Sequence, residues 1–133
     1  MNQNGTASAV TILVVDDDED MRFLARAVLE STDIVVAAEA EDGPQALDRL
    51  RELASPPIPT VVVLDNQMPG PSGLEVARKI LAELPDQLII LFSAFLNEDI
   101  VAEAERIGVS ACVSKGEAMN LAQIVQDLVD RNS

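Results

Sequence analysis

Histidine, tryptophan and tyrosine are absent from this 133-residue sequence, and cysteine occurs once. Without histidine, the chain cannot perform histidine-based acid–base catalysis, form most kinds of zinc site or carry a phosphohistidine of its own. The single cysteine, Cys112, cannot form an internal disulfide and fits a reducing, cytoplasmic environment. We expect its thiol to serve as a small buried apolar group, with a redox role as the alternative.

Basic residues are scarce: nine Lys and Arg stand against 23 Asp and Glu, for a formal net charge of −14. Nucleic-acid binders need basic surface and anionic membranes repel acidic chains, so direct binding to either is not expected. No apolar run approaches the roughly 18 residues of a membrane span. The N-terminus lacks the basic and apolar blocks of a signal peptide. The composition, 48% hydrophobic and 24% charged, is typical of one globular domain.

Two kinds of apolar pattern alternate along the chain after an expected flexible tail at residues 1–9. Buried strands are predicted at 11–15, 34–37, 60–65, 88–92 and 109–113, and apolar stripes with helical spacing at 21–29, 46–53, 74–84, 100–107 and 121–129. We expect Asn97 and Gly108 to cap the fourth helix, and the stretch from Ser55 to Pro59 to form a stiff connection. Five alternations predict a parallel sheet with helices on both faces.

The segment VVVLDNQMPGPSG, residues 61–73, places a carboxylate between a buried strand and a loop. Its two prolines lack an N–H and its two glycines permit positive φ, so a loop must follow the strand. Asp65 is therefore predicted at the carboxyl end of a central strand. For any single Asp, a helix cap or a turn is the more common role, and the other strands have to decide between the two.

The other predicted strands also end in polar residues. In open α/β sheets, ligands bind beyond the carboxyl ends of the strands. Those ends carry Asp16 and Asp17 after the first strand, Asp65 after the third, Ser93 after the fourth and Lys115 after the fifth. Each has an ordinary explanation as a solvated turn, a cap or a surface charge. Their joint placement at one sheet edge favours a site.

Three carboxylates at one edge repel each other, so either one is protonated or a cation neutralises them. Oxygen ligands without His or Cys indicate Mg²⁺. Together with a hydroxyl and an ammonium, such an ion can accommodate a phosphoryl group, and a carboxylate can become an acyl phosphate. Asp65 is the predicted nucleophile because it stands alone in mid-sheet, facing the paired acids.

These motifs resemble a response-regulator receiver domain (CheY-like) of bacterial two-component signalling. The matching segments are Val14 to Asp17, Leu64-Asp65 with Met68-Pro69 and Gly73, Phe92 to Ala94, and Ser114-Lys115. The resemblance covers about residues 11 to 131. It implies a flavodoxin-like (βα)5 three-layer sandwich, with a five-stranded parallel sheet in the order 2-1-3-4-5. A receiver domain over residues 10–133, with no output domain in this chain, is expected.

The resemblance also implies a role for each acidic residue. Asp65 would accept a phosphoryl group from the phosphohistidine of a sensor histidine kinase or a histidine phosphotransfer protein. Asp17, Asp65 and the backbone carbonyl of Gln67 would ligate Mg²⁺ directly, and Asp16 would act largely through water.

By the same resemblance, Ser93 and Lys115 would bind phosphoryl oxygens. Phosphorylation would then change the face formed by the fourth helix, the fifth strand and the fifth helix. That face would bind a downstream protein or a second copy of the chain. The expected chemistry is limited to self-phosphotransfer and slow autodephosphorylation.

Three positions depart from the family pattern. Cys112 stands three residues before the Lys, where Tyr or Phe is common, so the usual aromatic switch is absent. Phe95 could act in its place or shield the acyl phosphate together with Gln67; the other interpretation is a plain packing residue. Gly116 replaces the usual Pro after the Lys, which predicts a more mobile loop.

Two other functions share parts of this pattern. A Mg²⁺-dependent phosphatase with an aspartyl nucleophile usually has a second acid two residues later, where this chain has Gln67. A degenerate receiver that acts as a phosphorylation-independent interaction module is the other alternative. The presence of all five site residues argues against it.

Overall fold

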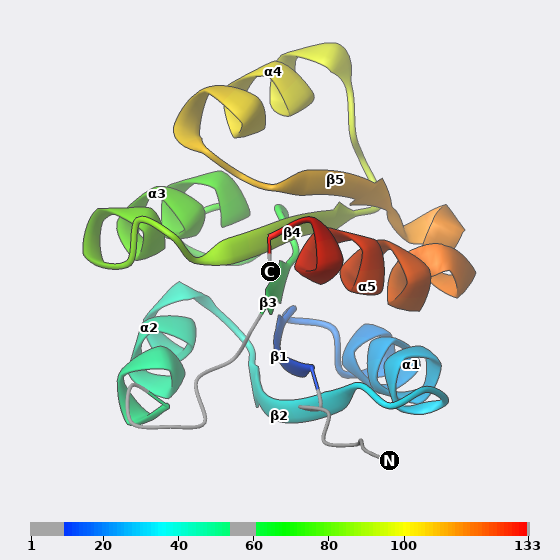
Figure 1. Ribbon diagram of the computed structural model, residues 1–133. Helices are drawn as coiled ribbons and strands as arrows, with labels where there is room; N and C mark the ends of the chain where they lie inside the picture. The colour runs from blue at the N-terminus through cyan, green and yellow to red at the C-terminus, as the bar shows by residue number, and fades with distance from the viewer. Residues whose placement is uncertain (1–9, 54–60, 133) are drawn as a thin grey trace.

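The computed structural model of the chain describes residues 10–53 and 61–132 (Figure 1). The predicted N-terminal tail and the predicted proline-rich connection lie outside the described residues. Within the described ranges, strands and helices alternate as the apolar patterns indicate.

The sheet has five parallel strands in the order β2-β1-β3-β4-β5, which confirms the predicted topology. The strands are β1 (Thr11–Val15), β2 (Val35–Ala40), β3 (Val61–Leu64), β4 (Leu88–Ser93) and β5 (Ala111–Ser114). The helices are α1 (Glu19–Glu30), α2 (Gly43–Glu52), α3 (Gly73–Glu83), α4 (Glu98–Ile107) and α5 (Leu121–Arg131), with a 3₁₀ segment, η2 (Lys115–Asn120), before α5.

Helices cover both faces of the sheet, with α1 and α5 on one side and α2 and α3 on the other (Figure 1). Successive strand side chains point to opposite faces, and the core is divided accordingly. Ile12 and Val14 of β1 belong to the cluster under α1 and α5, whereas Leu13 and Val15 belong to the cluster under α2, α3 and α4. Central strands buried on both faces explain the unbroken apolar runs in the sequence.

Two strand boundaries within the described residues differ from the predictions by two residues or more. β5 begins at Ala111 rather than residue 109, because the Val109 amide donates to the carbonyl of Ala104 (2.9 Å) and closes the end of α4. β2 extends to Ala40 rather than residue 37, because its pairing with β1 skips Ala37, resumes at Ala38 and continues to Ala40. The η2 segment was not predicted; it begins where the Ser114 hydroxyl accepts the Gly116 amide (3.2 Å).

The predicted caps of α4 are confirmed. Asn97 accepts the Ile100 amide (2.8 Å), and Gly108 adopts the left-handed conformation with φ of 100°. At the start of α3, Ser72 and Glu75 form a reciprocal capping box. The N-caps Asn97 and Ser72 fix the directions in which α4 and α3 leave the carboxyl edge of the sheet.

Side chains occupy the outer edge of β2. The Val36 amide donates to the Glu30 carboxylate (3.3 Å), and the Glu39 carbonyl accepts from Nε of Arg49 (3.2 Å). Both backbone groups belong to an edge strand, whose free hydrogen-bonding groups would otherwise face solvent.

Candidate functional site

The carboxyl ends of β1 and β3 place two buried carboxylates side by side. The Asp16 amide donates to the carbonyl of Ala40 (3.0 Å) and the Asp65 amide to that of Val15 (2.9 Å), so both residues continue the sheet ladder. Because side chains alternate along a strand, both point to the face that carries α1 and α5. Central strands therefore fix the backbone of both acids.

Oxygen atoms of Asp16, Asp17 and Asp65 lie within 4.8 Å of one another. The Lys115 ammonium lies 2.7 Å from Oδ2 of Asp16 and 3.5 Å from Oδ2 of Asp65. The predicted convergence of three carboxylates and one ammonium is thus present in the described part of the chain. The sequence did not predict that the shorter contact of Lys115 is to Asp16.

The environment of Asp65 disfavours its charged form. Burial raises the pKa of this carboxyl and the negative charge of Asp16 raises it further, against the opposing effects of Lys115 and of the Gln67 backbone amide. A cation added to the cluster would relieve both unfavourable effects.

The donor set fits a small hard cation. The three clustered ligands are all carboxylates, two of them buried and one, that of Asp17, exposed. Magnesium is commonly bound by one or two carboxylates with water and phosphate oxygens in the remaining positions. An exposed carboxylate beside two buried ones leaves room on the solvent side for such ligands.

The loop after β3 is held against the start of α3. The Gly73 amide donates to the carbonyl of Asn66 (2.9 Å), and the Leu74 amide donates to Oδ1 of Asn66 (3.0 Å). A Cβ atom at Gly73 would lie 2.2 Å from the backbone oxygen of Asp65. Glycine is therefore required here because α3 begins in direct contact with the backbone of Asp65.

The remaining predicted site residues differ in burial and in whether they contact the carboxylate cluster. Ser93 is fully buried, and its hydroxyl accepts from the Phe95 amide (3.4 Å); within the described residues it makes no hydrogen bond with the carboxylates. Gln67 reaches Asp65 through its backbone amide. Phe95 is 65% exposed, so it does not pack in the core. Cys112 is only partly buried, against the α3 and α4 side of the core, and burial raises the pKa of its thiol.

Arg22 and Asn66 contact the site but were not predicted from the sequence. Arg22 donates to the backbone carbonyl of Asp16 (2.7 Å), and Asn66 joins the loop to α3. The position of Arg22 as the first basic residue after the acidic run was an available signal. Its bond to a backbone oxygen depends on how α1 packs, which spacing does not reveal.

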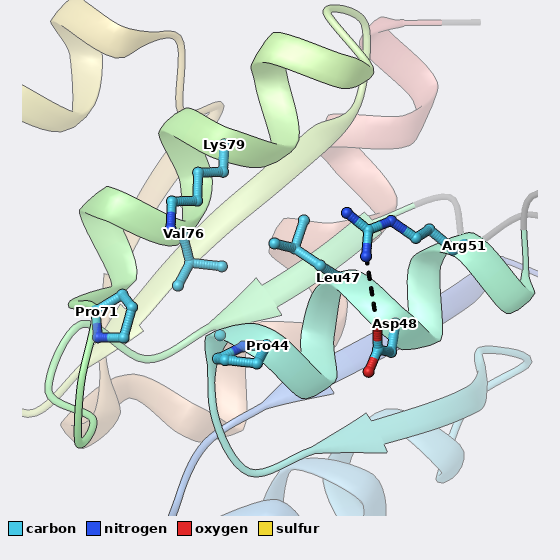
Figure 2. Close-up of a pocket in the computed structure, with 8 residues that line it drawn as sticks. Pro44, Leu47, Asp48, Arg51, Pro71, Val76 and Lys79 are labelled. Atoms are coloured by element: carbon cyan, nitrogen blue, oxygen red, sulfur yellow. Dashed lines mark hydrogen bonds and ion pairs between the residues drawn. The ribbon is translucent and has the colours of Figure 1, made fainter.

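A cavity of about 210 Å³ lies between α2 and α3. Figure 2 shows Pro44 and Leu47 on one wall and Val76 and Lys79 on the other. None of the carboxylates of the cluster lines this cavity, so it is separate from the predicted site.

Among the described helices, none has both the length and the apolar character needed to cross a membrane.

Comparisons with known proteins agree with this geometry. A family model described as the response regulator receiver domain matches residues 12–127. Protein CcdB of Bacillus subtilis is 36% identical over 104 residues, which are 78% of this chain and 83% of that protein. The chemotaxis protein CheY of Listeria monocytogenes is 33% identical over 104 residues, covering 78% and 84%.

A solved structure of a LuxR-family two-component response regulator from Aurantimonas has a TM-score of 0.83 and 30% identity. The match covers 92% of this chain and 87% of that one. The family match covers most of the chain, and the fold is the one that the resemblance implied. The chain belongs to the response regulator receiver domains, the phosphorylation-controlled switches of two-component signalling.

Proposed function

We propose that Asp65 is the residue that receives the phosphoryl group. The observation that carries this proposal is the cluster of Asp16, Asp17 and Asp65 oxygens within 4.8 Å of one another, with the Lys115 ammonium beside them. Asp65 is the member that projects from the middle of the sheet, between the acids of β1 and the base after β5. A phosphoryl group on Asp65 would have the positive charge of the Lys115 ammonium nearby.

The transfer can be written with its bonds balanced. A carboxylate oxygen of Asp65 attacks the phosphorus of a phosphohistidine on the donor. The new O–P bond forms as the P–N bond breaks, and the departing imidazole nitrogen takes up a proton. The Asp65 backbone, held by β1 and by the contact with Gly73, keeps the nucleophile in one position, which lowers the entropic barrier to attack.

We propose that Mg²⁺ is the cation of the site. Asp17, Asp65 and the Gln67 carbonyl would bind it directly, and Asp16 through water. When bound, Mg²⁺ supplies positive charge that balances the phosphoryl oxygens and the clustered carboxylates. The raised pKa of Asp65 supports this role, because a nearby positive charge favours the ionised nucleophile.

Lys115 and Ser93 are proposed to bind the phosphoryl oxygens. The Lys115 ammonium, 3.5 Å from Asp65, reaches a group attached there with a small movement away from Asp16. The Ser93 hydroxyl uses its acceptor capacity on the Phe95 amide, which leaves its proton to donate. Recruitment of Ser93 would pull on the loop that leads into α4.

The proposed output is a change in the face formed by α4, β5 and α5, which binds a downstream protein or a second copy of the chain. The donor is proposed to be a cytoplasmic histidine kinase or phosphotransfer protein. Three exposed apolar side chains support protein contacts: Phe23 is 72% exposed, Phe95 65% and Met119 81%. All three lie in segments that follow the carboxyl ends of strands.

The test is intact mass spectrometry after incubation with acetyl phosphate and Mg²⁺. The native chain should gain the mass of one phosphoryl group, and Asp65→Asn should not. Removal of Mg²⁺ with EDTA should abolish the gain. A gain in both proteins would move the acceptor to another residue, and no gain in either would overturn the proposal.

A further inference from the structure

We propose that Arg22 is a positioning residue for the metal-binding carboxylates, an inference that rests on the proposed function. Within the described residues, Arg22 makes no hydrogen bond or ion pair with the proposed nucleophile, Asp65. It acts by fixing the peptide plane between Asp16 and Asp17, the two adjacent acids at the end of β1.

The Arg22 side chain forms a buried clamp. Only 8% of the residue is exposed, although arginine is among the residues least often buried. Nη1 donates to the backbone carbonyl of Asp16 at 2.7 Å, and Nε donates to Oε1 of Glu39 at 3.0 Å. One guanidinium thus joins α1, the end of β1 and the neighbouring strand β2, and its planar fork suits two acceptors in different directions.

Every polar group of Asp16 has a partner. Its amide donates to Ala40, its carbonyl accepts from Arg22, Oδ1 accepts from the Asp18 amide (2.9 Å), and Oδ2 accepts from Lys115. The carboxylate of Asp16 is therefore held independently of Arg22. Arg22 instead fixes the orientation of the Asp16 carbonyl, and with it the orientation of the peptide plane between Asp16 and Asp17.

The direction of the Asp17 carboxylate depends on the orientation of this peptide plane. It is exposed, and its carboxylate makes no hydrogen bond or ion pair within the residues that the structure describes. Its direction is set by its backbone, one end of which is the peptide plane that Arg22 fixes. If this plane rotates, the Asp17 oxygen leaves the group of three, and the site loses its exposed carboxylate ligand.

The effect is geometric rather than a matter of net charge. The Arg22 guanidinium faces two carboxylates, Glu39 at 3.0 Å and Glu41 at 4.0 Å. Arg26 also binds Glu39, at 2.7 Å, and Glu30 at 3.3 Å. Two arginines therefore face three glutamates. These glutamates balance the positive charge of Arg22, which leaves little net charge to act on the aspartate cluster. Losing the bond to the carbonyl should matter more than losing the charge.

Arg26 provides a matched control. It shares the Glu39 partner, comes from the same helix and carries the same group, but within the described residues it binds Glu39 and Glu30 and not Asp16. Arg26→Gln removes an ion pair of the same kind without touching the peptide plane. Arg22→Lys keeps a charge but cannot donate in two fixed directions.

The experiment measures direct Mn²⁺ binding to the unphosphorylated chain by electron paramagnetic resonance, with Mg²⁺ as competitor. Urea unfolding of each protein runs in parallel. Arg22→Gln should weaken metal affinity by about 10-fold, at the lower end of what loss of a group that orients metal ligands costs. Arg22→Lys should weaken it by a similar factor, and Arg26→Gln should leave it within about twofold of the native chain.

Equal affinities for the Gln variants at positions 22 and 26 would overturn the inference, even if both variants lost stability. Native-like affinity in Arg22→Lys would also overturn it, because charge alone would then suffice. Where Arg22→Gln does not fold, Arg22→Lys against Arg26→Gln decides. Phosphorylation of the native chain, checked by mass, tests the function separately from the metal-affinity ratio.

Discussion

Gly73→Ala is the substitution for which the structure gives the clearest quantitative expectation. An added Cβ would lie 2.2 Å from the backbone oxygen of Asp65, 2.6 Å from Cα of Asn66 and 2.8 Å from the carbonyl carbon of Asp65. Ordinary contact begins at 3.4 Å, so the methyl group penetrates by more than 1 Å. All three atoms are backbone and cannot rotate away.

The cost has two parts. Overpacking of this kind costs about 1–3 kcal/mol, and displacement of α3 also breaks the bond from the Gly73 amide to Asn66, worth about 1 kcal/mol. Replacing a glycine at a compatible site returns about 0.4–1 kcal/mol through the unfolded state. The net destabilisation should be about 1–4 kcal/mol. Because the clash involves the Asp65 backbone, phosphorylation should slow as well.

Gly116→Ala is the matched control. Its added Cβ would have one near neighbour, Oγ of Ser114 at 3.5 Å, which is an ordinary contact. The assay is urea unfolding followed by far-ultraviolet circular dichroism, together with the rate of phosphorylation by acetyl phosphate. Gly116→Ala should match the native chain or exceed it slightly in stability. A Gly73→Ala protein within about 0.5 kcal/mol of the native chain would refute the reasoning.

Four further predictions follow from the site and its supports. Folding raises the pKa of Asp65, so the charge of this carboxylate destabilises the folded state at pH values above the ordinary aspartate pKa. Asp65→Asn should therefore be more stable than the native chain at neutral pH. This difference in stability should shrink as the pH falls and Asp65 becomes protonated. Burial opposes ionisation of Glu39, but hydrogen bonds from Arg26 and Arg22 hold its pKa below the ordinary value. Glu39→Gln should therefore be less stable than the native chain at neutral pH, and this difference should disappear as the pH falls through the lowered pKa. A difference in stability that does not depend on pH would contradict the prediction. Asn97→Ala should cost about 1 kcal/mol in urea unfolding through loss of the α4 cap, and no measurable loss would count against the cap. Phe95→Ala should shorten the lifetime of the acyl phosphate, followed by loss of phosphoryl mass over time, without changing stability, whereas equal lifetimes would remove a shielding role for this exposed ring.

The sheet order and the convergence of the acids could be predicted because they depend on features that local sequence carries. Unbroken apolar runs identify central strands, and the carboxyl ends of parallel strands share one edge. Asp16 and Asp65 therefore had to meet once five strand–helix alternations were recognised. The same reasoning brought Lys115 to this edge, as the structure confirms.

Other features depend on contacts between distant elements and could not be read from spacing. The shorter contact of Lys115 is to Asp16, at 2.7 Å, against 3.5 Å to Asp65, and sequence spacing does not carry a difference of this size. Arg22 reaches a backbone oxygen only because α1 packs against the ends of β1 and β2. The late start of β5 reflects the bond from the Val109 amide to the Ala104 carbonyl, which makes Val109 part of the end of α4.

The occupied edge of β2 limits how this domain can associate with other chains. An incoming strand would have to displace the Glu30 carboxylate from the Val36 amide and the Arg49 guanidinium from the Glu39 carbonyl before it could extend the sheet. Strand addition at this edge is therefore disfavoured in either phosphorylation state. A partner that approaches the β2 side of the sheet is therefore left with side chains on the flanking helices and loops, and backbone pairing is left to the opposite edge, β5.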